Sequence, residues 1–504
     1  MRKIILLITA YISCIQFVSA QSSPKEITDK IGLFDKYIQS SIPLWKTTGL
    51  AVAVVKDGKV IFKKGYGVTD IRTKQPFTTS TISFCASTTK AMTAACIGML
   101  VDEGKLKWDD KLKNILPDFR LYDPYVSDEI TVRDILRHNA GLGNGDLLWL
   151  FGYSSEEMLR RMRYIQPAYS FRSSFIYQNL MYTVAGEVIK KVSGMPWNEF
   201  ITKRIFQPLG MNHTYTLFKN SAAEPSRVTP HFMYGDTLIK PIDAIDFGGY
   251  DAAGSVVSCI DDITKWVTFL QDSAIINGQR LIKAETFTEF FKPQSFVTPQ
   301  EFYPTQAKTH PHWMTYGFGW FQQDYRGKMI QFHTGSLDGA IAIFGSVPEE
   351  KFSIYIFANL DHSELRHALM WKAIDLWSFN DNGRDWSTEL FYHYKSLRDA
   401  GRKAEQDKEA KRVLGTKPSL SIDNYTGKFT NEIYGDAEVS LVNNELTIKF
   451  PNNISLALKH WHYDVFQGAF NYEWYGKSWI IFGLNNEGKI AQFDFDGVVY
   501  QKKQ

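Results

Sequence analysis

The stretch ASTTKAMTAACIGML, residues 86–100, decides the fold of this chain. Its large apolar side chains recur at helical spacing on one face from Met92 to Leu100, which predicts a buried helix that ends near Gly104. Ser87 and Lys90 stand three residues apart at the first turn, so their side chains should share a face. A serine needs a base within hydrogen-bond reach to act as a nucleophile. The helix dipole and partial burial both disfavour a charged ammonium, so we expect Lys90 to be that base.

Two later motifs complete the set that acyl transfer needs: YQN at residues 177–179 and HTG at residues 333–335. The Tyr177 phenol can carry a proton to a leaving group, and the Asn179 amide offers a donor and an acceptor to a substrate. Gly335 would let a substrate approach the backbone closely.

Each of these residues also has a structural interpretation when it is taken alone. Ser87 would serve as a helix cap, Lys90 as a solvated side chain and Tyr177 as a packed aromatic ring. Asn179 would cap a helix that starts at Leu180. Agreement among the three motifs favours catalysis, and Tyr-x-Asn occurs once among the 25 tyrosines.

Outward from this helix, the pattern predicts an α+β domain. GLAVAVV at residues 49–55 precedes Asp57-Gly58 and another apolar run, which predicts a β-hairpin. Apolar runs that alternate with turns predict further strands over residues 316–358. Between these ends lies a mainly helical subdomain, with helices predicted at residues 131–138 and 180–193. The antiparallel sheet, flanked by helices, should therefore join segments that are far apart in the chain.

The charge pattern changes after this domain, which we place at residues 26–380. Residues 381–413 carry dense mixed charge, which predicts a helical linker in solvent. Residues 414–504 show short alternating strands with frequent turn signals, which predicts a small antiparallel β-barrel or sandwich.

The N-terminus predicts export. Arg2 and Lys3 precede an apolar run, and Val18-Ser19-Ala20 suits a signal-peptidase site, so residues 1–20 are interpreted as a signal peptide. A retained membrane anchor is the alternative. Either way, we expect a periplasmic or extracellular location.

Composition excludes some classes of function. The formal net charge of +3 becomes 3 − 2 = +1 without Arg2 and Lys3, which gives no electrostatic signature of nucleic-acid binding. Three cysteines remain after residue 20, so no disulfide framework is expected. His310–His312 and His460–His462 lack partners at metal-ligand spacing. We therefore expect no metal and no cofactor; the oligomeric state is left open.

Taken together, the motifs resemble those of the serine β-lactamase and penicillin-binding-protein superfamily, in its class C-like esterase, D-aminopeptidase and D,D-carboxypeptidase branch. The resemblance covers roughly residues 30–380. Its further support comes from GLAVAVV at 49–55, LRHNAGL at 136–142, AGSVVS at 253–258 and YGFGW at 316–320. The C-terminal segment is similar to the lipocalin-like domain of some members.

The resemblance implies a role for each motif residue. Ser87 would be acylated, Lys90 would activate it, Tyr177 would act as general base and acid, and Asn179 would hold the substrate amide. His333, Thr334, Gly335 and Ser336 would form the substrate-binding strand, with the backbone N–H groups of Ser87 and Ser336 as the oxyanion hole.

His333 departs from the family pattern, because β-lactamases usually have lysine there. A histidine is mostly neutral above pH 7 and gives no fixed positive charge for a substrate carboxylate. We therefore expect an exported serine hydrolase that cleaves an amide or ester, such as a peptide with a D-amino acid.

Three alternatives stay open. The first is a class C-like β-lactamase. The second is a penicillin-binding sensor or peptidoglycan-binding module with little turnover, for which peptidoglycan fragments would be the partner. The third is a binding protein whose function resides in the barrel.

Overall fold

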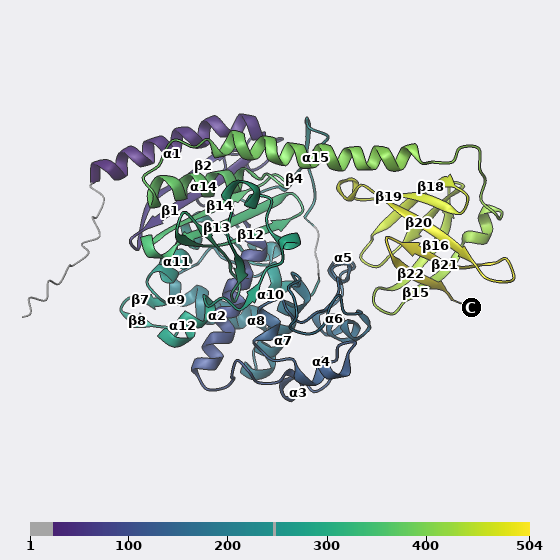
Figure 1. The fold of residues 1–504 in the computed structure, drawn as a ribbon, viewed down its shortest axis with the longest axis horizontal. Coiled ribbons are helices and arrows are strands. Elements are labelled where there is room, and N and C mark those ends of the chain that lie inside the picture. Colours follow the sequence, from purple (N-terminus) through teal and green to yellow (C-terminus); the bar gives the residue numbers. More distant parts are fainter. Residues whose placement is uncertain (1–23, 245–247, 504) are drawn as a thin grey trace, which may run out of the picture.

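The computed structural model describes residues 24–244 and 248–503, which form a mixed α/β body and a barrel joined by a long helix (Figure 1). An eight-stranded sheet organises the body, in the order β2-β1-β14-β13-β12-β11-β10-β9. Every neighbouring pair in it is antiparallel. The strands are β1 (Gly49–Lys56), β2 (Lys59–Gly67), β9 (Ser295–Phe296), β10 (Met314–Tyr316), β11 (Phe321–Tyr325), β12 (Lys328–Leu337), β13 (Ala340–Val347) and β14 (Phe352–Ala358).

The predicted hairpin and the predicted union of distant segments are both confirmed. β1 and β2 pair across the Asp57-Gly58 turn, and Leu50 pairs with Ala358. Successive residues of β1 enter different cores, because side chains alternate between the faces of a strand. Val52 packs on the side of α14 (Leu365–Ser378) and α1 (Pro24–Trp45), whereas Ala51 faces the side of α11 (Ile260–Gln271).

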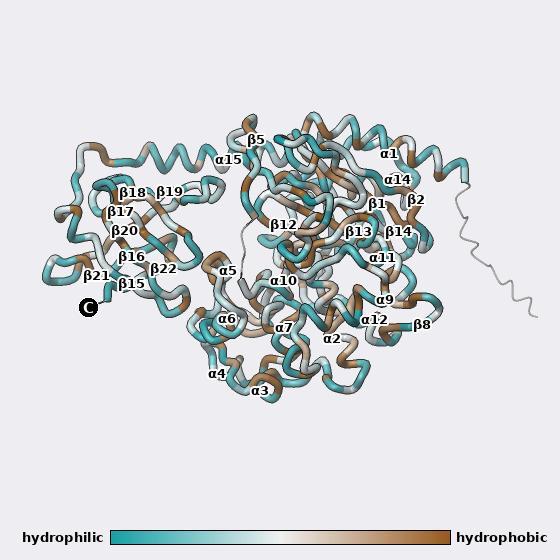
Figure 2. Tube along the Cα trace, turned by 180° about the vertical axis from the view of Figure 1, so that it is seen from behind, coloured by the Kyte–Doolittle hydropathy of each residue, from teal (hydrophilic) through white to brown (hydrophobic). Residues whose placement is uncertain are grey.

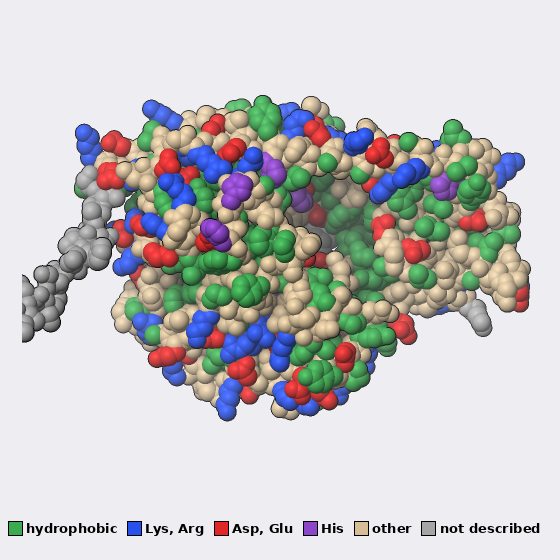
Figure 3. Space-filling view, viewed as in Figure 1, with side chains coloured by type: hydrophobic (Ala, Val, Ile, Leu, Met, Phe, Trp, Pro, Cys, Tyr) green, Lys and Arg blue, Asp and Glu red, His purple; other side chains and the backbone are tan. Residues whose placement is uncertain are grey.

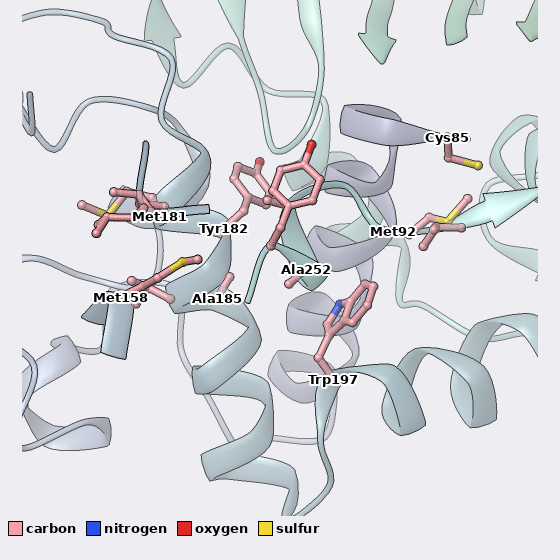
Figure 4. Packing of buried hydrophobic residues seen from close by; sticks show 14 of the residues in the cluster. Cys85, Met92, Met158, Met181, Tyr182, Ala185, Trp197 and Ala252 are labelled. Carbon is pink, nitrogen blue, oxygen red and sulfur yellow. The ribbon is translucent and has the colours of Figure 1, made fainter. Parts of the chain in front are cut away.

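The helical side is built around α2 (Thr89–Asp102) and α7 (Asn179–Ser193), whose neighbours include α8 (Trp197–Ile201) and α10 (Asp251–Gly254). Every residue of α2 from Thr89 to Leu100 is buried, which confirms the predicted buried helix. A helix enclosed on all sides lies inside a domain. Figure 4 shows Met92, Tyr182, Trp197 and Ala252 packed among these helices.

The helix predicted at residues 131–138 is wrong, since only the short 3₁₀ helix η2 (Asp134–Leu136) forms there. The buried Asp134 carboxylate accepts hydrogen bonds from the Thr131 backbone N–H at 2.9 Å and the Thr131 hydroxyl at 2.7 Å. Arg137 and Arg172 complete its shell. Local side-chain bonds of this kind compete with helix formation.

Shorter elements complete the body. The helices are η1 (Ala86–Thr88), α3 (Leu112–Ile115), α4 (Pro124–Glu129), α5 (Leu147–Leu150), α6 (Ser155–Arg161), α9 (Gln207–Leu209), α12 (Ala284–Phe290) and α13 (Gln306–Thr309). The two-stranded sheets are β3 (Ser83–Phe84) with β6 (Val257–Ser258), β4 (His231–Tyr234) with β5 (Leu238–Pro241), and β7 (Ile275–Ile276) with β8 (Gln279–Arg280).

Helix α15 (Trp386–Ala410) occupies most of the predicted linker and leads to the barrel. Its first turns are anchored by buried Trp386, Leu390 and Tyr394, whereas residues 396–410 are exposed. Figure 2 shows this second half as mostly hydrophilic.

The C-terminal segment forms a closed eight-stranded antiparallel barrel, which confirms the predicted fold class. Aromatic side chains fill its interior, including Phe429, Phe466, Phe482, Phe493 and Tyr500, each at most 4% exposed. Its strands are β15 (Gly427–Asn431), β16 (Gly435–Val442), β17 (Glu445–Lys449), β18 (Ser455–His462), β19 (Val465–Phe470), β20 (Lys477–Leu484), β21 (Ile490–Phe495) and β22 (Val498–Lys502). Whether this barrel is lipocalin-like stays a prediction.

The predicted signal peptide lies outside the described residues, so it stays a prediction. Among the helices of residues 24–244 and 248–503, none combines the length and apolar character that crossing a bilayer requires.

We expect Trp386→Ala to lower the free energy of unfolding of the body by ~3–5 kcal/mol, as truncation of a buried tryptophan does. The indole is fully buried, stacks on Trp371 at 5.7 Å between ring centres, and donates to Asp375 at 2.6 Å. Chemical denaturation measures the change. The matched control on the same helix is Tyr392→Ala, because Tyr392 is 61% exposed. Equal losses for both variants would contradict the anchoring role of Trp386.

Candidate active site

Ser87 lies in the turn η1, immediately before α2. Its neighbours Ala86 and Thr88 are buried, whereas Ser87 itself is partly exposed. Ala86 adopts a φ of 47°, a left-handed conformation that costs a non-glycine residue of order 1–3 kcal/mol. Strain in the residue before the serine is a feature of sites where the backbone must present one side chain to a cleft.

Lys90 meets Ser87 as the sequence predicts, and its amine is fully buried. Nζ lies 3.1 Å from Ser87 Oγ, 2.7 Å from Asn179 Oδ1 and 2.8 Å from the Ala253 carbonyl oxygen. Burial holds the pKa of the amine well below its usual value, opposed by the negative charge of Asp146. A neutral amine can donate to the two carbonyl oxygens, which directs its lone pair at the Ser87 hydroxyl.

Asn179 is the first residue of α7, and Gln178 occupies the N-cap position without a capping side-chain bond. The side chain of Asn179 therefore does not cap the helix. Because Asn179 Oδ1 accepts from Lys90, the motif serves the base as well as a substrate.

Tyr177 also reaches this centre. Lys90 Nζ lies 5.0 Å from the centre of its ring. Burial raises the pKa of the phenol well above its usual value. The ring packs against buried His138 at 4.4 Å, and His138 Nδ1 accepts the Gln178 backbone N–H. Tyr177 is therefore a protonated donor held beside the nucleophile.

Strand β12 closes the other side of the site. β11 pairs with β12 only as far as Phe332, so one edge of β12 has no β11 partner from His333 onward. A Cβ added at Gly335 would lie 2.2 Å from the Cys85 carbonyl oxygen, so only glycine permits this approach to the turn that carries Ser87. Thr334 bonds to Tyr303 at 2.6 Å, and Ser336 is exposed to the cleft.

His333 lies behind this edge and is 1% exposed. Its Nε2 is 3.0 Å from the Tyr316 hydroxyl, and its Nδ1 is 2.6 Å from the Thr334 carbonyl oxygen. Burial lowers the pKa of the imidazole to about 3. His333 is thus neutral at every physiological pH and braces the strand.

The sequence did not reveal Arg366, which grips the same strand. Its guanidinium donates to the Gly335 carbonyl at 2.6 Å and to Ser336 Oγ at 2.9 Å. It also pairs with Glu364, and both charged side chains are less than 10% exposed. A lone Glu-x-Arg pattern carries no sequence signal, because the contact with β12 depends on tertiary structure.

Two further residues beside Ser87 were missed. Burial raises the pKa of the Tyr250 phenol above its usual value. Burial raises the pKa of Asp146 to about 6, while Asn179 and Lys90 lower it. A cavity of about 500 Å³ adjoins this side, with Phe84, Phe218, Tyr250 and Leu337 in its wall.

No group of three or more His, Cys, Asp or Glu side chains within residues 24–244 and 248–503 is placed to hold a metal ion. The buried thiols of Cys85, Cys96 and Cys259 are free.

These features are the apparatus of a serine acyl-transfer enzyme. The family model "Beta-lactamase" matches residues 41–376, and the chain belongs to this family of serine hydrolases. A second model, "Domain of unknown function (DUF3471)", matches residues 411–503 and so covers the barrel.

Relatives and solved structures agree with this assignment. The chain is 27% identical to "Unguisins hydrolase ungD'" of Aspergillus campestris (strain IBT 28561) over 80% of its length and 76% of the relative. It is 23% identical to "Protein flp" of Staphylococcus aureus (strain N315), over 65% of this chain and 62% of that protein.

Among solved structures, the octameric penicillin-binding protein homologue from Pyrococcus abyssi superposes with a TM-score of 0.62 at 20% identity, covering 94% of this chain and 100% of that one. The crystal structure of SurE superposes with a TM-score of 0.55 at 17% identity, covering 95% of this chain and 99% of that one. These likenesses establish the fold.

Asp146→Asn should move the acid limb of the kcat/KM profile to lower pH. Activity needs the neutral Lys90 amine and therefore rises with pH through its pKa. The Asp146 carboxylate raises that pKa, so its removal lowers it further. The exposed carboxylate of Asp128 gives the control Asp128→Asn. If the acid limb stays at the same pH in Asp146→Asn, that limb reports the titration of a group other than Lys90.

Arg366→Lys should lower the acylation rate of Ser87 at least about tenfold, because lysine has no planar fork to hold Gly335 and Ser336 together. Stopped-flow acylation with an activated ester measures this. Tyr394→Phe is the control, since the Tyr394 hydroxyl meets His367 at 3.4 Å in the same buried cluster without touching β12. A folded Arg366→Lys protein that acylates at the normal rate would remove the positioning role.

Proposed function

We propose that this protein is an exported hydrolase that cleaves an amide or ester of a small or peptide substrate containing a D-amino acid, through an acyl-enzyme at Ser87. The observation that carries the proposal is the Lys90 amine, buried and 3.1 Å from Ser87 Oγ with its other contacts satisfied by carbonyl oxygens.

The geometry supports a reaction in two stages, acylation and hydrolysis. Ser87 Oγ attacks the substrate carbonyl carbon, and its proton passes to Lys90 Nζ. Backbone N–H groups of Ser87 and Ser336 stabilise the oxyanion. The C–N or C–O bond then breaks as the leaving group takes a proton by way of Tyr177. Water, deprotonated by the same groups, attacks the ester carbonyl and releases the acid, which regenerates Ser87.

The neutral His333 supports the substrate class. A fixed cation at this position would favour a carboxylate-bearing β-lactam, and the buried imidazole supplies none. The similarity to "Unguisins hydrolase ungD'" supports hydrolytic turnover over a sensor that is acylated and stays so. The sequence of residues 1–20 supports export.

Ser87→Ala should abolish covalent labelling by a fluorophosphonate, because the Ser87 hydroxyl is the one that meets Lys90 Nζ in the described part of the chain. Intact-mass spectrometry would then follow the wild type with D-amino-acid amides, simple esters and β-lactams. We expect transient adducts with the amides and esters. Ser255→Ala is the control, because the Ser255 hydroxyl lines the adjoining cavity but donates to Asp251.

Three results would change the proposal. Lasting adducts without product release would favour the penicillin-binding sensor. Release of β-lactam products faster than ester products would favour a β-lactamase. Undiminished labelling of Ser87→Ala would mean that another residue is the nucleophile.

A further inference from the structure

The barrel contacts the body on both sides of the cleft that contains Ser87. On the sheet side, the contact falls on Asp338, two residues after Ser336, in the turn between β12 and β13. Asp338 Oδ2 accepts hydrogen bonds from Trp474 Nε1, at 3.0 Å, and from the Tyr475 hydroxyl. Both aromatic residues lie in η9 (Glu473–Tyr475), the turn between β19 and β20. Two donors on one half-buried carboxylate oxygen make this a specific contact.

On the helical side, the barrel holds the loop that leads to Asp146. The Tyr434 hydroxyl donates to the Asn144 carbonyl at 3.3 Å, and the Tyr153 hydroxyl donates to the Tyr434 carbonyl at 2.9 Å. Phe151 stacks on Phe450 with 5.1 Å between ring centres, and each is less than 10% exposed. Buried aromatic stacking adds about 0.5–1.5 kcal/mol to the burial of apolar area.

The two contacts hold the barrel against the turn that follows Ser336 and against the loop that leads to Asp146. Figure 3 shows a hollow between the body and the barrel beneath α15, so space remains between the two parts. The barrel interior holds packed aromatic rings, so its outer wall and turns are the surfaces available to a substrate.

We infer that this wall sets a size limit on the substrate, with Trp474 and Tyr475 on Asp338 as the residues that fix it. The inference rests on the proposed function of Ser87. A compact amide or ester, or the free end of a short peptide, enters the hollow and reaches the serine. A strand of polymeric peptidoglycan does not, because both lips of the cleft are tied to the barrel.

The double substitution Trp474→Ala and Tyr475→Phe removes both donors to Asp338. Two p-nitrophenyl esters with the same leaving group serve as probes: the acetate, and one whose acyl group is attached at the middle of a long polyethylene-glycol chain, so that the ester lies far from either chain end. We expect the ratio of kcat/KM for the bulky ester to kcat/KM for the acetate to rise at least about tenfold in the full-length variant. Tyr475→Phe alone should give a smaller rise in the same direction.

Glu473→Gln is the matched control, because it removes only the exposed ion pair with Lys240 at 3.3 Å in the same turn. Its ratio should equal that of the wild type. An unchanged ratio in the double variant, with the acetate still hydrolysed and the melting transition intact, overturns the size limit alone. If the double variant misfolds, the ratio of kcat/KM for the bulky ester to kcat/KM for the acetate is measured in Tyr475→Phe instead. A rise in that ratio supports the size limit, and an unchanged ratio overturns it. A wild type that hydrolyses neither ester overturns the proposed function and the size limit together.

Discussion

The burial of one primary amine governs the chemistry of this protein. Lys90 is enclosed because α2 runs through the interior of the body with its whole surface covered. In such surroundings the charged form of an amine is disfavoured, and proximity to Ser87 turns this unfavourable burial into basicity directed at one hydroxyl. In the proposed reaction, the fold therefore produces a base by withholding water from Lys90.

The other parts of the site keep that amine and its serine in register. Asn179 and the Ala253 carbonyl take the amine's protons, while Arg366 and neutral His333 hold the substrate-binding strand. The barrel adds a third level of control through Asp338, which lies just beyond the same strand. Lys90, the strand β12 and the barrel thus come from three separate regions of the chain and surround the same site.

Sequence patterns predicted the features whose signals are local. Ser87 with Lys90, the β-hairpin at Asp57-Gly58 and the barrel each depend on spacing or turn residues within a short stretch. Asp146 and Arg366 escaped prediction because only the tertiary fold brings Asp146 to Lys90 and Arg366 to Gly335 and Ser336. The helix expected at residues 131–138 failed because the buried Asp134 takes the Thr131 N–H.

The exposed half of α15 carries a geometric consequence. Each residue of an α-helix adds about 1.5 Å to its length and about 100° to its rotation. A single insertion or deletion in this spacer would therefore swing the barrel around the helix axis and separate it from both of its attachment points at once. Insertions or deletions in this part of α15 are then tolerated mainly when they add or remove close to whole helical turns. The distance between the body and the barrel therefore changes in steps of about one turn.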